Sequence, residues 1–185
     1  MTGTLRLLGL GDSLTFGYMV PTGYLRMVEE DLRAEHPGAD LHVFNHGVCG
    51  DTVLDGLARA PALLTTLSPT TVLVQFGLND CFCGISPGRF LRGLEELVEE
   101  CRRLVSGIRV LLVPPPPLRD PSMELAVPPF REAFDVVGLR HGIAVAPVVA
   151  RWNAGPRNGG LWLSDGVHPS VAGYRLMADA VLAEL

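Results

Sequence analysis

Serine, aspartate and histidine occur in this chain in a pattern that suits nucleophilic catalysis. Ser13 follows a short apolar run near the start, and Asp165 and His168 lie three residues apart near the other end. At that spacing a carboxylate can accept a hydrogen bond from imidazole Nδ1, which leaves Nε2 free to take a proton from a serine hydroxyl. These residues could therefore supply the nucleophile, base and orienting group of a serine hydrolase.

Acyl transfer also needs hydrogen-bond donors for the oxyanion that forms during attack. Asn79, which follows a β-branched run, offers a side-chain amide, and segment 45–52 (Asn-His-Gly-Val-Cys-Gly-Asp-Thr) contains two glycines. A glycine can present its backbone N–H without a side chain that blocks the substrate, so Gly47 and Gly50 are both candidates. Asp80 is better explained as a residue that caps or braces its loop.

Two other motifs that contain glycine are each excluded at one position. A nucleophile elbow, G-x-S-x-G, would need a second glycine where this chain has Thr15. A dinucleotide-binding G-x-G-x-x-G motif that starts at Gly9 would need a third glycine where it has Leu14. Ser13 therefore belongs to a different kind of strand-to-helix turn.

Four segments together, around Ser13, over 45–52, around Asn79 and over 165–169, resemble the SGNH (GDSL) hydrolase superfamily of lipases, acylhydrolases and esterases. The resemblance extends over residues 5–185. It implies an oxyanion hole made by the N–H groups of Ser13 and Gly50 and the amide of Asn79, and no metal or cofactor. It also implies an α/β fold, a flavodoxin-like three-layer α/β/α sandwich whose five parallel strands have the order 2-1-3-4-5.

The order of elements favours the same class of fold. Apolar runs alternate with stretches of helical periodicity, which is typical of a parallel sheet with helices on both faces. Such sheets bind ligands beyond the carboxyl ends of their strands, where the four segments should meet. The predicted strands are 5–10, 41–45, 70–76, 108–113 and 143–148; the predicted helices are 24–35, 53–67, 87–105, 128–141 and 171–185; 118–127 and 151–164 are predicted loops. Pro169 is expected to open the last helix, which would place His168 at its positive end.

Composition limits the class of protein. A chain of 185 residues with 48% hydrophobic and 19% charged residues should form a packed globule, most simply one domain over 1–185. A net charge of −5 without any cluster of Lys or Arg argues against a nucleic-acid partner. No apolar run is long enough to span a bilayer. A cytoplasmic location is expected, because removal of 5–10 as a signal peptide would remove the first strand.

The cysteines are interpreted as reduced thiols. Cys101 falls on the apolar face of a predicted helix and should be buried. Cys49, Cys81 and Cys83 lack the spacing of a zinc site, and no second pair of ligands completes one.

The sequence therefore predicts a serine esterase that acts on small-molecule carboxylic esters, with short acyl chains favoured. Substrate contacts are expected from Asp12, Phe16, Phe82 and Trp162. A carbohydrate O-deacetylase, a thioesterase and a lysophospholipase are alternatives that would use the same residues. The alternative outside enzymes is a ligand-binding module that keeps the motifs as vestiges.

Overall fold

The sheet determines where the candidate residues lie. The structure, a computed structural model, describes residues 3–156 and 160–185. Within them, five parallel strands form one sheet in the order β2-β1-β3-β4-β5, so the predicted order is confirmed. The strands are β1 (Leu5–Gly11), β2 (Leu41–Gly47), β3 (Thr71–Gln75), β4 (Arg109–Leu112) and β5 (Ala144–Val145).

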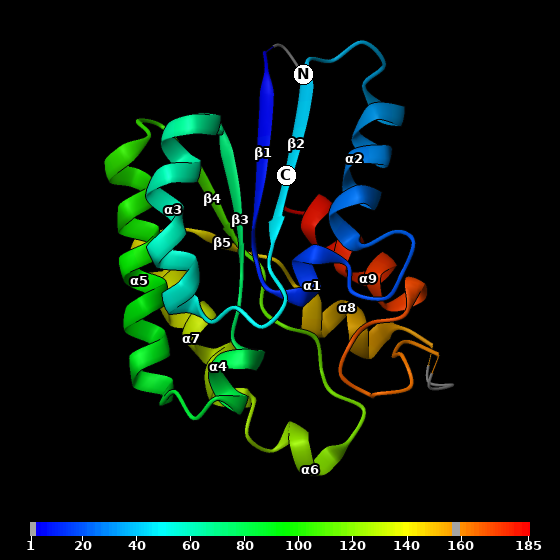
Figure 1. The fold of residues 1–185 in the computed structure, drawn as a ribbon. Coiled ribbons are helices and arrows are strands. Elements are labelled where there is room, and N and C mark those ends of the chain that lie inside the picture. The colour runs from blue at the N-terminus through cyan, green and yellow to red at the C-terminus, as the bar shows by residue number, and fades with distance from the viewer. Residues whose placement is uncertain (1–2, 157–159) are drawn as a thin grey trace.

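Helices cover both faces of the sheet and complete the predicted three-layer sandwich (Figure 1). Side chains alternate between the faces along a strand. In β1, Leu7 packs in the apolar cluster under one helical layer, whereas Leu8 and Leu10 pack in the cluster under the other. One layer holds α2 (Tyr24–Glu35), α8 (Val148–Ala154) and α9 (Val171–Leu182); the other holds α3 (Val53–Leu67), α5 (Pro87–Leu104) and α7 (Pro128–His141).

Short helices gather at the carboxyl edge of the sheet (Figure 1). Gly11, the last residue of β1, is in register with Gly47 of β2 and with Gln75 of β3. The segments that leave these three strands therefore start side by side. The short helices are α1 (Ser13–Phe16), α4 (Leu78–Phe82) and α6 (Pro121–Glu124).

The largest departure from the prediction lies between residues 143 and 154. The predicted strand 143–148 ends at Val145, and Val148 begins α8, which extends into the predicted loop 151–164. A short apolar run does not distinguish a strand from a buried helix by its periodicity. Here Trp152 of α8 is buried against Gly173 of α9. Residues 157–159 of that predicted loop lie outside the described residues.

Cys101 is buried, as predicted; Cys49 and Cys83 are exposed, and Cys81 is partly buried. Among the described residues, no group of three or more His, Cys, Asp and Glu side chains is arranged to hold a metal ion. In the same part of the chain, no helix combines the length and apolarity needed to cross a bilayer. The cytoplasmic location and the single domain over 1–185 stay predictions.

Candidate active site

Ser13, His168 and Asp165 are joined by hydrogen bonds between their side chains. Ser13 Oγ lies 2.9 Å from His168 Nε2, and His168 Nδ1 lies 2.8 Å from Asp165 Oδ2. Ser13 and His168 are 155 residues apart in sequence, so the fold alone brings them together. The arrangement is that of a nucleophile, a base and an orienting carboxylate.

The Asp165 carboxylate also fixes the turn that carries His168. Its Oδ1 accepts hydrogen bonds from the N–H groups of Val167 and His168, at 2.9 and 3.0 Å. Burial alone would raise the pKa of Asp165, but the hydrogen bonds from the His168 ring and from these N–H groups outweigh it and lower the pKa. An ionised carboxylate only accepts hydrogen bonds, so His168 Nδ1 carries the proton and Nε2 faces Ser13 as an acceptor.

Ser13 is the first residue of α1, and Asp12 caps that helix. Asp12 Oδ1 accepts the N–H of Leu14 at 2.8 Å, and only 1% of Asp12 is exposed. Burial raises the pKa of Asp12 to about 7, and the charges of Asp80 and Asp51 add to the rise. The prediction that Asp12 contacts substrate is wrong, because its side chain is enclosed by protein.

The surroundings of Gly47 and Gly50 distinguish the two candidate donors. The Gly47 N–H donates to Asn45 Oδ1 at 3.0 Å, and a Cβ on Gly47 would lie 2.1 Å from the backbone N of Phe16. Gly47 therefore permits the close approach of β2 and α1. Gly50 has φ +89° and open space around a Cβ position. Neither its N–H nor that of Ser13 donates to another described residue, so both are available to an oxyanion.

Asn79 lies in α4, beside the segment between β2 and α3. Its Nδ2 donates to the backbone oxygen of Asp51 at 2.9 Å, which leaves the second N–H of the amide available. Asp80 is buried and accepts hydrogen bonds from the N–H groups of Gly77 and Val53, at 3.1 and 3.0 Å. Asp80 therefore braces its loop, as predicted, and burial raises its pKa.

Comparison with known proteins identifies the family. The sequence profile of the GDSL-like lipase/acylhydrolase family matches residues 10–176, which include every candidate catalytic and donor residue. The chain belongs to this family. The predicted superfamily and the predicted enzyme class, a serine hydrolase of carboxylic esters, are thereby confirmed.

Relatives of this GDSL-family chain match it over nearly its whole length. Esterase TesA of Pseudomonas aeruginosa is 29% identical over 95% of this chain and 85% of its own. The acetylxylan esterase of Geobacillus stearothermophilus is 28% identical over 97% of this chain and 93% of its own. The crystal structure of TesA has a TM-score of 0.82 at 28% identity, and the match covers 97% of each chain.

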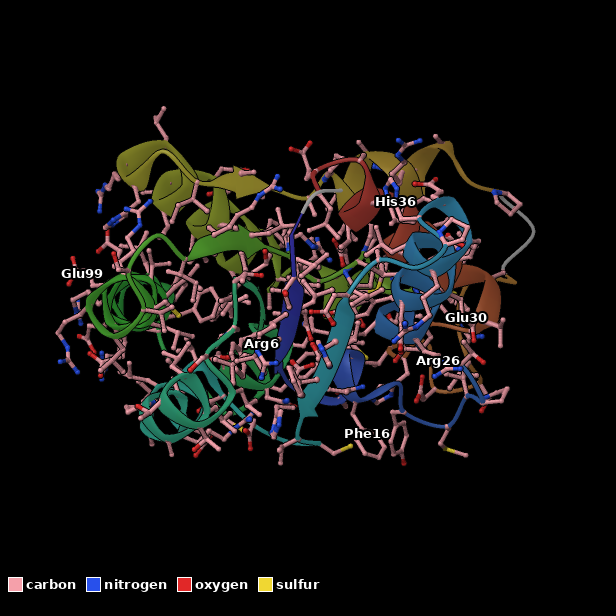
Figure 2. All side chains as sticks on the ribbon, turned by 90° about the horizontal axis from the view of Figure 1, so that it is seen from above. Arg6, Phe16, Arg26, Glu30, His36 and Glu99 are labelled. Atoms are coloured by element: carbon pink, nitrogen blue, oxygen red, sulfur yellow. The ribbon has the colours of Figure 1, made fainter. Side chains whose placement is uncertain are left out.

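The other three residues predicted to contact substrate differ in exposure. Phe16 and Phe82 are 55% and 46% exposed, and Figure 2 shows Phe16 at the outer surface of the molecule. Trp162 is partly buried: its Nε1 donates to the backbone oxygen of Pro117 at 2.8 Å, and its ring lies 5.3 Å from that of Trp152. Trp162 thus anchors its segment, and contact of all three with substrate stays a prediction.

His168 lies before α9 rather than in its first turn. The N-cap of α9 is Ser170, and Pro169 forms an isolated β-bridge with Trp162. The prediction that Pro169 opens the helix is therefore wrong. The His168 ring is instead packed against that of Tyr18, with 4.5 Å between the centroids.

Two arginines that no sequence motif singles out contact the site. Arg59 binds a carboxylate in the segment that carries Gly50, and Arg119 donates to the backbone of the segment that carries Asp165. Arg59 is the only basic residue of α3, and this isolated charge is the feature of the sequence that could have drawn attention to it. Nothing in the sequence distinguishes Arg119 from other loop arginines.

Proposed function

We propose that this protein hydrolyses carboxylic esters of small molecules through an acyl-enzyme on Ser13. The observation that carries the proposal is the line of hydrogen bonds from Asp165 through His168 to Ser13 Oγ, at 2.8 and 2.9 Å. Ser13 Oγ attacks the carbonyl carbon while His168 Nε2 takes its proton. His168 then protonates the leaving alcohol, the C–O bond breaks, and the acyl group stays on Ser13.

The tetrahedral intermediate places a negative charge on the former carbonyl oxygen. The N–H groups of Ser13 and Gly50 and the free N–H of the Asn79 amide would stabilise this charge. Water then attacks the acyl group and gives a proton to His168 Nε2. His168 returns this proton to Ser13 Oγ as the bond to the acyl group breaks, and the acid leaves. None of these steps uses a group from outside the chain except water.

We also infer a preference for short acyl chains. Phe16, Val48 and Phe82, on the segments that carry the nucleophile and the donors, are 45–55% exposed. Solvent reaches these side chains, which supports a shallow apolar surface rather than a deep tunnel. Each CH₂ contributes about 0.8 kcal/mol only if it is buried, so a longer chain gains little here.

Labelling with a fluorophosphonate tests the nucleophile. The wild type should react at Ser13, and Ser13→Ala should stay unlabelled and lose kcat by about 10⁶-fold, as in a serine protease without its nucleophile. Thermal unfolding of Ser13→Ala should match the wild type, because loss of one hydroxyl creates no large cavity. Wild-type turnover in folded Ser13→Ala would contradict the mechanism, and an unlabelled, inactive wild type would favour a binding module.

A series of p-nitrophenyl esters tests the acyl preference. The ratio kcat/KM should be highest between acetyl and roughly octanoyl and fall toward palmitoyl, since the added CH₂ groups remain in water. A steady rise toward palmitoyl, or activation at a lipid interface, would show a deep acyl site and contradict the open surface.

A carbohydrate O-deacetylase is the second candidate. It is supported by the acetylxylan esterase, which is 28% identical over 97% of this chain. An acetyl group also falls within the short acyl chains that the surface would accept. Acetylated xylo-oligosaccharides, p-nitrophenyl acetate and acetyl-CoA, compared by kcat/KM, separate a deacetylase from an unspecific esterase and from a thioesterase.

A further inference from the structure

The side chain of Arg59, the only basic residue of α3, reaches two of the segments that carry candidate oxyanion donors. Its Nε donates to Asp51 Oδ2 at 2.8 Å, and its Nη2 donates to the backbone oxygen of Gly11 at 2.9 Å. The side chain is 24% exposed, and that of Asp51 is 14% exposed. The fork of a guanidinium allows both bonds at once, which a single ammonium group matches less well.

The two acceptors lie next to different donors. Gly11 ends β1 two residues before Ser13, and Asp51 directly follows Gly50. The backbone oxygen of Asp51 in turn accepts the Nδ2–H of Asn79 at 2.9 Å. One guanidinium is therefore connected, directly or through Asp51, to all three donor segments.

Among the described residues, few other contacts could orient the segment around Gly50. Gly50 has φ +89°, and nothing lies within 4 Å of a Cβ position on it. Two main-chain hydrogen bonds hold the segment. The Val48 N–H donates to the backbone oxygen of Gly11 at 3.0 Å, and the Asp51 N–H donates to that of Val48 at 3.2 Å. The direction of the Gly50 N–H thus depends on where Asp51 is held.

Resting on the esterase function proposed above, we propose that Arg59 is a positioning residue for the oxyanion hole. It holds Asp51, and with it the Gly50 N–H and the Asn79 amide, at a fixed place relative to Ser13. This positioning should stabilise the transition state, in which charge develops on the substrate oxygen. Loss of the two bonds should lower kcat, because a misplacement of about 1 Å can cost about 100-fold in rate.

Three variants separate positioning from packing. Arg59→Met keeps most of the side-chain volume but removes every donor. Arg59→Lys keeps the charge and one point donor, so it should recover part of the activity. The matched control is Arg26→Met on α2, which Figure 2 shows beside Glu30. Among the described residues, Arg26 pairs only with Glu29 and Glu30.

Steady-state kinetics with p-nitrophenyl acetate gives the first readout. Arg59→Met should lose about 10–100-fold in kcat with a much smaller change in KM, Arg59→Lys should lose less, and Arg26→Met should match the wild type. The second readout is the affinity for a trifluoromethyl ketone, which forms a tetrahedral adduct with the serine. That affinity should fall in parallel with kcat.

Several outcomes would overturn the proposal. Folded Arg59→Met with wild-type kcat is one, and a raised KM at unchanged kcat is another, since it marks a binding residue. A merely structural role predicts a lower Tm with unchanged kcat per folded molecule. If Arg59→Met does not fold, Asp51→Ala decides, because it removes the carboxylate but keeps the backbone oxygen that Asn79 binds; wild-type kcat in Asp51→Ala would reject the proposal.

The two proposals fail in different ways. Failure of the esterase function appears as absent hydrolysis and absent fluorophosphonate labelling in the wild type. Failure of the Arg59 proposal appears as equal kcat and equal ketone affinity in the wild type and in the folded variants.

Discussion

The donor region, which follows β1, β2 and β3, differs from the acid–base region, residues 160–169, in what holds it. In the donor region, Gly11 is in register with Gly47 and Gln75, so main-chain bonds of the sheet set the spacing of the segments. Beyond the strands, the carboxylate of Asp80 holds the segments together: it is 0% exposed and accepts hydrogen bonds from two backbone N–H groups. The donor region is therefore an extension of the sheet.

The acid–base region is held by bonds between two irregular segments. The Arg119 N–H donates to the backbone oxygen of Gly166 at 2.9 Å, and Arg119 Nη2 donates to that of Ser164 at 2.6 Å. The Trp162 indole donates to the backbone oxygen of Pro117 at 2.8 Å. These contacts join the segment before α9 to the segment after β4. Among the described residues of this region, the only strand pairing is the isolated bridge between Trp162 and Pro169, within the segment before α9.

This difference suits the tasks proposed for the two regions. Donors lower a barrier only if they are in place before the charge develops, and a rigid sheet edge provides this without reorganisation. A base must hold one tautomer and one direction while it takes and returns a proton. A carboxylate that binds both the ring and the backbone of His168 supplies this within a single turn.

Replacement in the acid–base region should have the larger effect on rate. Asp165→Asn should lower kcat by about 10⁴-fold, as the equivalent change does in a serine protease, because an amide can stabilise the wrong tautomer of His168. The Tm should change little, since 40% of the Asp165 side chain is exposed. A loss of kcat below tenfold in the folded variant would show that the backbone bonds alone orient the imidazole.

Replacement in the donor region should cost less, because two donors remain. Asn79→Ala should lower kcat by about 10²–10³-fold and change KM much less, by analogy with loss of one oxyanion donor in a protease. Asn153→Ala, at an exposed position of α8, is the matched control. A raised KM at unchanged kcat would show that Asn79 binds substrate and is not an oxyanion donor.

The donor region is also the part that the sequence predicts best. Continuous apolar runs mark β1 and β3, so the positions of Ser13 and Asn79 just beyond their strands could be anticipated. The helices Tyr24–Glu35, Val53–Leu67 and Pro128–His141 have the predicted bounds. The bounds of these helices follow from local apolar periodicity and from the residues at their ends, both of which can be read from the sequence.

The remaining features depend on contacts that no local pattern encodes. Val148–Ala154 is helical because Trp152 packs under α9, although its apolar run is equally typical of a strand. Pro169 pairs with Trp162 instead of opening the last helix. Arg59 reaches acceptors 8 and 48 residues away, which only the folded sheet brings within its range.

The pKa values of two carboxylates at the site shift in opposite directions. Hydrogen bonds outweigh burial at Asp165 and lower its pKa, whereas burial raises the pKa of Asp12 to about 7. The unfolded chain releases the Asp12 proton near its ordinary pKa of about 3.9, but the folded protein keeps it until about pH 7. Between these values the folded state binds more protons, so Asp12 makes the free energy of unfolding fall as pH rises.

Asp12→Asn should therefore remove this dependence and have the smallest effect on rate. The Asn Oδ1 can still accept the Leu14 N–H, so the cap of α1 and kcat should change little. Urea unfolding of both proteins from pH 4 to 8 measures the difference. The stability of Asp12→Asn relative to wild type should rise with pH across the window, by at most about 1.4 kcal/mol per unit, and level off above pH 7. Curves that stay parallel throughout would show that Asp12 is ionised in the folded state.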